Sequence, residues 1–321
     1  MQLGVLTVPL YGMSLDEALG YLKAQGVQTV EIGGGGYPGK GHCNPAQLLA
    51  DEARLKEFQD TFAKHEMGLC ALSCHGNPIH PNKEIAKGYD DDLTDTILLA
   101  EKLGVKTIVT FSGCPGDHEG AKLPNWVTCA WPPDYLEVLD YQWNEVLIPY
   151  WKQKSEFAKA HGIEKIAFEL HPGFCVYNTA SMLRLREAVG PILGANVDPS
   201  HLFWQGMDPV KVIYELGDAI YHFHAKDTAV NPYQTPINGV LDTHDYGDLM
   251  NRSWVFRTVG YGHDEKTWRD IISALKTVGY DGAVSIEHED ALMSQKEGLE
   301  KAISFLKNVL IFENATDMWW A

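Results

Sequence analysis

Hydrophobic residues along this chain cluster into eight short strand-like runs, and most of these are separated by segments long enough to form a helix. The expected strands are residues 3–7, 29–33, 68–74, 106–111, 165–170, 194–199, 220–226 and 283–288. The expected helices are residues 14–25, 46–65, 91–103, 141–161, 179–189, 209–216, 265–278 and 294–309. Regular alternation of strands and helices is typical of a parallel α/β fold. Eight such units predict a (β/α)8 TIM barrel.

The alternation of side chains within the late strands predicts which residues point into this barrel. In residues 165–170 every second side chain is large and apolar, and Glu169 lies on the other face. In residues 283–288 the apolar side chains again alternate with a face of small and polar residues that carries Glu287. Because the apolar face of a barrel strand meets the helices, both glutamates should point toward the axis. The same phase groups Asn196 with Asp198 and His222 with His224.

Four residues with side chains that bind metal ions fall at the ends of the late strands. Glu169, Asp198, His224 and Glu287 offer oxygen and nitrogen ligands of the kind that suit Mn²⁺, Mg²⁺, Co²⁺ or Zn²⁺. Their successive spacings of 29, 26 and 63 residues correspond to one strand–helix–strand unit, a second unit, and a unit with an insertion. We therefore expect the four side chains to meet at the C-terminal face of the barrel.

Several histidines compete for roles in this site. His222 is the alternative ligand to His224 in the same strand, and His201 is expected to contact a ligand or the substrate because the metal already has four partners. His75 and His171 either reach the cavity or are buried structural residues. The glutamates could also be buried charges balanced by a base, but unpaired inward carboxylates are costly, which favours the metal site.

Two segments are expected to be long irregular loops, residues 113–133 after the fourth strand and residues 228–262 after the seventh. Loops of this length in a compact domain are usually functional, and both would overhang the metal. They carry large aromatic side chains, which either bind a sugar ring or an aromatic group, or pack the loops or an oligomer contact: Trp126, Trp131, Tyr233, Tyr246, Trp254 and Phe256.

Composition narrows the class of protein further. The chain has 321 residues, which we expect to form a single TIM-barrel domain over residues 1–321, and it lacks an apolar run near the ~20 residues of a membrane span. With no signal segment at its start, it is expected to be cytoplasmic. The net charge of −17 disfavours nucleic acid as a partner. Six cysteines without a Cys-x-x-Cys pair are expected to be free thiols.

Four segments together resemble the sugar phosphate isomerase/epimerase superfamily, the xylose isomerase-like TIM barrels. The segments are Glu169 with His-Pro-Gly at 171–173, Asn-Val-Asp-Pro-Ser-His at 196–201, His-Phe-His-Ala-Lys-Asp at 222–227, and Tyr-Asp-Gly at 280–282 leading into Ile-Glu-His-Glu at 286–289. The superfamily includes D-tagatose 3-epimerase, inosose dehydratase, catalytic subunits that remove the aglycone from 3-keto-glycosides and C-glycosides, and, more distantly, endonuclease IV. The resemblance covers nearly the whole chain.

This resemblance implies one divalent metal ion, most often Mn²⁺, held by Glu169, Asp198, His224 and Glu287. In the epimerases, the two matching glutamates also exchange a proton with opposite faces of the substrate. A metal ion that polarises a carbonyl lowers the barrier to removing the neighbouring hydrogen, and a carboxylate beside it can act as the base. The catalytic candidates are therefore Glu169, Glu287 and His201.

Departures from the family patterns concern the substrate. The epimerases place an arginine six residues after the histidine ligand, where Val230 stands in this chain, so Lys226 or Arg257 is expected to take over that contact. Thr110 stands where endonuclease IV would have a further metal-binding histidine, which argues against DNA repair. No basic cluster accompanies the Gly-Tyr-Gly turn at 260–262, so the substrate is expected to be unphosphorylated.

Three functions fit these residues. The first is an isomerase or epimerase that abstracts a proton beside the carbonyl of a keto-sugar. The second is a lyase with the same first step, either a dehydratase of the inosose type or a deglycosidase of 3-keto-glycosides. The third is a non-catalytic sugar-binding subunit, and a homo-oligomer or a second subunit would be compatible with each of them. The expected substrate-binding residues are His75, His171, Lys226, Arg257 and Trp126.

Overall fold

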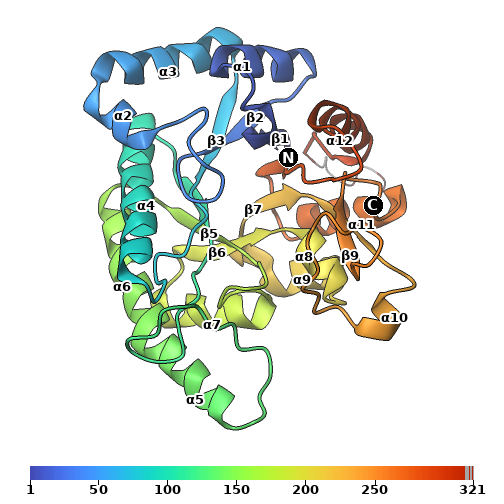
Figure 1. The fold of residues 1–321 in the computed structure, drawn as a ribbon. Coiled ribbons are helices and arrows are strands. Elements are labelled where there is room, and N and C mark those ends of the chain that lie inside the picture. The colour runs from blue at the N-terminus through green and yellow to red at the C-terminus, as the bar shows by residue number, and fades with distance from the viewer. Residues whose placement is uncertain (315–317, 319, 321) are drawn as a thin grey trace.

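A computed structural model describes residues 1–314, 318 and 320 and shows a closed barrel of eight parallel strands within them (Figure 1). The order around the barrel is β1-β10-β7-β6-β5-β4-β3-β2. The strands are β1 (Gln2–Leu6), β2 (Thr29–Gly33), β3 (Gly68–Ser73), β4 (Thr107–Thr110), β5 (Lys165–Glu169), β6 (Leu193–Val197), β7 (Ile220–Ala225) and β10 (Ala283–Ile286). The predicted fold is confirmed, and each strand begins or ends within a few residues of its expected bounds.

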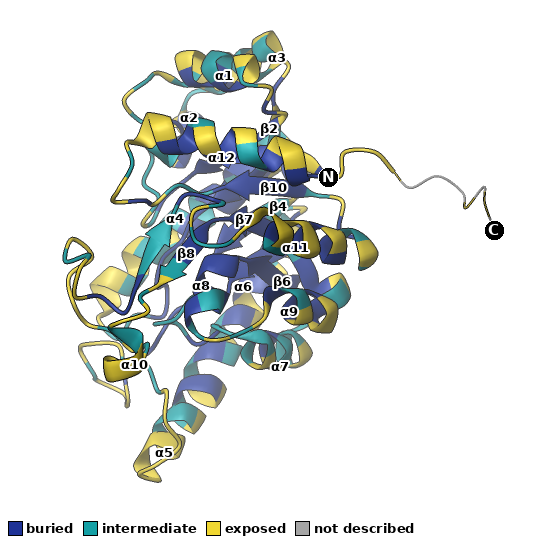
Figure 2. Cartoon of the chain, turned by 90° about the vertical axis from the view of Figure 1, so that its right-hand side faces the viewer, coloured by how far each residue is buried: buried dark blue, intermediate teal, exposed yellow. Residues whose placement is uncertain are grey.

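Helices surround the barrel, with their inner faces buried against the strands and their outer faces exposed (Figure 2). They are α1 (Leu15–Ala24), α2 (Pro45–Ala50), α3 (Glu52–His65), α4 (Lys83–Leu103), α5 (Asp134–Asp140), α6 (Ile148–Ala160), α7 (Thr179–Val189), α8 (Pro199–Trp204), α9 (Pro209–Leu216), α11 (Glu265–Thr277) and α12 (Gln295–Val309). Short 3-10 turns occupy Val8–Leu10 and Gly217–Ala219. Ser14 and Glu17 form the capping box that starts α1.

Three helices differ from the prediction. The helix expected over residues 46–65 is split into α2 and α3 at Asp51, whose backbone is extended and whose carboxylate accepts the N–H groups of Ala53 and Arg54. Helix α4 begins earlier than expected because Asn82 caps it. The helix expected over residues 141–161 starts earlier in the structure, with α5. It then continues through a π-helical segment, Tyr141–Leu147, into α6.

The segment after β7 was expected to be irregular, and this was wrong. It contains a two-stranded antiparallel sheet of β8 (Asp227–Val230) and β9 (Trp254–Arg257), and the short helix α10 (Thr235–Asn238) lies between these strands. The two strands are separated by more than twenty residues, so no short turn signal in the sequence announces their pairing. The segment after β4, by contrast, is irregular as predicted.

Small apolar side chains from three strands cluster inside the barrel, and large ones pack between the strands and the helices. Ala71, Val109 and Ala167 form an interior cluster, so β5 has the predicted phase and Glu169 shares the inner face with Ala167. On the outer face of β5, the ring of Phe168 packs edge-on against Trp151 of α6 at 4.5 Å. This contact fixes the strand that presents Glu169. No helix in the described part of the chain is long and apolar enough to cross a membrane.

Candidate metal centre

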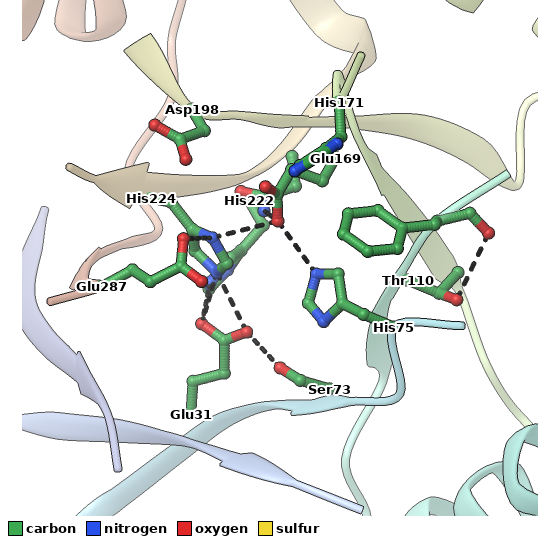
Figure 3. Close-up of polar contacts among 12 residues, drawn as sticks. Glu31, Ser73, His75, Thr110, Glu169, His171, Asp198, His222, His224 and Glu287 are labelled. Atoms are coloured by element: carbon green, nitrogen blue, oxygen red, sulfur yellow. Dashed lines mark hydrogen bonds and ion pairs between the residues drawn. The ribbon is translucent and has the colours of Figure 1, made fainter. Parts of the chain in front are cut away.

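Four acidic and imidazole side chains meet at the C-terminal end of the barrel. Glu169 ends β5, Asp198 follows β6 and caps α8, His224 lies in β7, and Glu287 follows β10. Each offers one ligand atom, and these atoms all lie within 4.8 Å of one another. Glu169, Asp198 and His224 are buried, and the side chain of Glu287 is 17% exposed. Four adjacent strands of the barrel thus deliver three carboxylates and one imidazole to one point (Figure 3).

Hydrogen bonds hold two of the carboxylates in the cluster. Oε1 of Glu169 is hydrogen-bonded to Nε2 of His201 at 3.0 Å, whereas Oε2 lies 3.0 Å from Nε2 of His75 without the geometry of a hydrogen bond. Oδ1 of Asp198 accepts the backbone N–H of Ser200 at 2.8 Å. The carboxylates are therefore held in fixed orientations before any ligand arrives.

Two buried atoms in the cluster lack a hydrogen bond of good geometry. Nδ1 of His224 lies 3.2 Å from Glu287 and 3.4 Å from Glu169, and Oδ2 of Asp198 lies 3.2 Å from Nζ of Lys226, but none of these contacts is a well-aligned hydrogen bond. Buried polar groups are normally satisfied, so such atoms call for a partner. A divalent cation that prefers oxygen and imidazole ligands fits this set of donors.

The accumulation of negative charge also favours a cation. Burial raises the pKa of Asp198 to about 6, with Glu169 and Glu287 adding to the shift and Lys226 opposing it. Burial alone would lower the pKa of His224, but Glu31 and Glu287 outweigh it and hold this pKa well above its usual range. Three carboxylates this close together repel one another, and a bound cation would relieve that repulsion.

Lys226 is the cationic side chain beside this cluster. Its Nζ lies 2.7 Å from Glu287, 3.1 Å from Glu289 and 3.2 Å from Asp198, and the side chain is buried. Burial would lower the pKa of Lys226, but the surrounding carboxylates, Asp198 first, raise it well above its usual value. The ammonium also lies 4.7 Å from the centre of the Phe256 ring. A buried positive charge thus lies directly beside the ligand cluster.

His171 and His75 line the same cavity. Nδ1 of His171 donates to the carbonyl of Pro172 at 2.6 Å, and burial lowers the pKa of this imidazole to about 3. A neutral ring that donates from Nδ1 keeps Nε2 as a hydrogen-bond acceptor for a hydroxyl group. His75 packs edge-on against Phe111 at 4.6 Å. Burial likewise lowers the pKa of His201, whose ring lies 4.1 Å from that of His171.

Two adjoining cavities open at this end of the barrel. The first, of about 400 Å³, is lined by Glu169, Glu287, His75, His171 and Lys226 among others. The second, of about 450 Å³, shares His171 and Glu289 with it and is otherwise lined mainly by Tyr246, Leu249, Val255 and Phe256. Both volumes lie within the range of small-molecule sites. The first carries residues of the ligand cluster together with apolar side chains such as Phe111 and Phe174, whereas most of the residues that line the second are aromatic or aliphatic.

Two predicted substrate-binding residues are not among those that line the cavity with the ligand cluster. Trp126 lines a separate cavity together with Tyr177 and Arg184, and none of the four clustered ligands lines that cavity. Arg257 in β9 donates from Nε to Asp290 at 3.1 Å. Of the predicted substrate-binding set, His75, His171 and Lys226 therefore line the cavity with the ligand cluster, and Trp126 does not.

Glu31 is a further buried carboxylate that the sequence reasoning missed. It lies in β2 with none of its surface exposed, and it contacts both His222 and His224. The signal was present, because Glu31 alternates with the apolar residues Val30 and Ile32, as Glu169 does with its neighbours. The prediction considered only residues at the ends of strands, which lie at the mouth of the barrel, whereas Glu31 lies deeper.

The fold and the arrangement of this cluster define the class of protein. A family model of the xylose isomerase-like TIM barrel matches residues 19–309, so the chain belongs to that family. Over 312 residues the chain is 40% identical to the "Uncharacterized protein YfiH" of Bacillus subtilis (strain 168), which covers 97% of this chain and 99% of that protein.

Solved structures of low sequence identity share the fold. The probable 3-DHS dehydratase AsbF of Bacillus anthracis matches with a TM-score of 0.67 and 18% identity, over 96% of this chain and 99% of that chain. An IolI protein with a bound zinc atom matches with a TM-score of 0.65 and 18% identity, over 97% and 98% of the two chains. A D-psicose 3-epimerase matches with a TM-score of 0.59 and 14% identity, over 97% and 99%.

Proposed function

We propose that this protein is a divalent-metal-dependent isomerase or epimerase that abstracts a proton beside the carbonyl of an unphosphorylated keto-sugar. The observation that carries the proposal is the group of four ligand atoms within 4.8 Å of one another, two of them buried without a well-aligned hydrogen bond. Glu169 and Glu287 of this group line a cavity of about 400 Å³, large enough for a sugar. The zinc-binding IolI and the D-psicose 3-epimerase, which share the fold, make this chemistry a reasonable expectation.

Glu169, Asp198, His224 and Glu287 would hold the ion, which we propose to be Mn²⁺, with Mg²⁺, Co²⁺ or Zn²⁺ as alternatives. When bound, a divalent ion supplies Lewis acidity that polarises the carbonyl and its neighbouring hydroxyl. The remaining chemistry belongs to side chains of the protein. His171 offers an acceptor to a sugar hydroxyl, and Lys226 offers a donor to an oxygen that gains negative charge.

The proton transfer needs a carboxylate on each side of the substrate. Glu169 comes from β5 and Glu287 follows β10, and two other strands separate these in the barrel. One carboxylate removes the hydrogen on the carbon beside the carbonyl, and the electron pair of that bond shifts to give an enediolate. The other returns a proton to the same carbon from the opposite face, which gives the epimer. Return of the proton to the neighbouring carbon instead gives the isomer.

The test is proton NMR of the enzyme in D₂O with added Mg²⁺ and a panel of free ketoses, inososes and 3-keto-glycosides. Deuterium is expected at the carbon beside the carbonyl, together with an epimer or isomer as product. Glu287→Gln should abolish this exchange while the barrel remains folded. Glu164→Gln is a matched control, because this glutamate lies just before β5 with its side chain 67% exposed. A folded, metal-loaded Glu287→Gln variant with undiminished exchange would overturn the proposal.

A second candidate is a lyase that uses the same proton abstraction to release an aglycone from a 3-keto-glycoside. The adjoining apolar cavity of about 450 Å³ favours it, because a free ketose has no apolar group to place there. Tyr246 and Phe256 stack with ring centres 5.9 Å apart in its wall and offer a flat surface for an aromatic aglycone. In the same NMR experiment, a released aglycone would select the lyase. No exchange with any compound and any divalent metal would favour a non-catalytic sugar-binding subunit.

A further inference from the structure

Glu31 lies inside the barrel beneath the ligand cluster and collects hydrogen bonds from three strands. Its carboxylate accepts from Nε2 of His222 at 2.7 Å, from Nε2 of His224 at 3.0 Å and from the hydroxyl of Ser285 at 2.8 Å, and it also accepts from the hydroxyl of Ser73. The donors lie in β3, β7 and β10. Burying a carboxylate costs free energy of folding unless it is paired in this way, and these neighbouring side chains supply the pairing.

The geometry of the network fixes the direction of the imidazole above Glu31. Both carboxylate oxygens face Nε2 of His224, at 3.1 Å and 3.0 Å, and the hydroxyls of Ser73 and Ser285 donate to the same carboxylate. With Glu31 as the acceptor of these bonds, Nε2 is the nitrogen of His224 that carries the hydrogen. Nδ1 of the same ring then points toward Glu169 and Glu287, at 3.4 Å and 3.2 Å (Figure 3).

We propose that Glu31 is a positioning residue that selects Nδ1 of His224 as the metal-binding atom and holds the ring in that orientation. The inference rests on the proposed metal site and extends it to a residue that touches neither metal nor substrate. Histidine ligands commonly donate their second N–H to a carboxylate, and loss of such a partner typically weakens metal binding by about 10-fold to 100-fold. In this barrel the partner comes from β2, more than 190 residues away in sequence.

A second metal ion between Glu31, His222 and His224 is the main alternative, because one ligand atom of each lies within 4.8 Å of the others. The hydrogen bonds argue against it. Ser73 and Ser285 donate to the same carboxylate that both imidazoles contact, so its acceptor positions are already used. The inner group is therefore a hydrogen-bonded support for the upper cluster, and we expect one ion per chain.

The first experiment compares Mn²⁺ binding by calorimetry in the wild-type protein, Glu31→Gln and Glu164→Gln. Glutamine keeps the size of the side chain but adds an N–H₂ group, which needs an acceptor and favours the wrong tautomer of His224. We expect Glu31→Gln to bind Mn²⁺ about 10-fold to 100-fold more weakly. Glu164→Gln makes the same chemical change just before β5, at a side chain that is 67% exposed, and its Mn²⁺ affinity should match that of wild type.

The second experiment reads the tautomer directly in the wild-type protein, and a variant serves only to assign the signals. In zinc-loaded wild-type protein with ¹⁵N-labelled histidine, the ring signals assigned by comparison with His224→Gln should show a hydrogen on Nε2 and zinc on Nδ1. Zinc on Nε2, two ions per chain, or equal affinity of Glu31→Gln and wild type would each overturn the inference. A wild-type protein that binds no divalent ion would instead overturn the proposed function.

Discussion

Asp227→Asn should strongly destabilise the protein, because the carboxylate of Asp227 holds together the sheet that walls the apolar cavity. Oδ2 accepts the backbone N–H groups of Gly260, Gly262 and His263 at 2.9–3.1 Å, and the indole N–H of Trp268 at 3.2 Å. Oδ1 accepts the backbone N–H of Thr228 and Nδ1–H of His263, both at 2.8 Å. The side chain is completely buried.

The structure allows an order-of-magnitude estimate of the cost. Asparagine has one acceptor oxygen, and its best orientation keeps that oxygen in the place of Oδ2. The buried N–H of Thr228 then loses its acceptor, which costs about 1–3 kcal/mol. The bonds at Oδ2 change from charge-assisted to neutral, and each loses roughly 1 kcal/mol at most. Allowing for relaxation, we expect a loss of about 3–5 kcal/mol.

The assay is thermal unfolding followed by circular dichroism or calorimetry. For a chain of this size, about 2 °C per kcal/mol gives a fall in Tm of roughly 6–10 °C. Asp264→Asn is the matched control, because Asp264 lies next to the same turn but is an exposed helix cap that asparagine can replace. A fall below about 2 °C, or one equal to that of Asp264→Asn, would refute the assigned role of Asp227.

Three further predictions concern the site itself. Asp198→Ala should lose the bound metal after dialysis, and undiminished metal content in elemental analysis would contradict its role as a ligand. Lys226→Met should lower kcat by about 10²–10³ with bound metal retained, because it removes the charge that faces the developing oxyanion, and an unchanged kcat would exclude this role. Phe256→Ala should raise KM for substrates with an aryl group more than for free keto-sugars. Equal changes in KM for both would show that the cavity lined by Phe256 does not bind the substrate.

Much of the site follows from local patterns in the sequence. Alternation within residues 165–170 predicts that Glu169 faces inward, and its interior neighbour Ala167 confirms the phase. Spacings of about one strand–helix–strand unit predict that Asp198 and His224 reach the same end of the barrel. These inferences succeed because side-chain alternation in a strand and the length of a strand–helix–strand unit can both be seen within a few tens of residues. Short-range capping explains the starts of the helices in the same way.

The tertiary structure decides what depends on contacts across the barrel. The pairing of β8 with β9 follows from Asp227, which gathers N–H groups from a turn more than thirty residues away, and no local pattern marks that partnership. The position of Trp126 in a separate cavity follows from the path of a loop that lacks regular structure. The support of His224 by Glu31 needs β1 to pair with both β2 and β10. The sequence by itself determined the eight barrel strands, their inward faces and the residues at their ends, because these depend on near neighbours. Closure of the barrel decided which side chains meet, because only closure brings residues almost 200 positions apart within hydrogen-bonding distance.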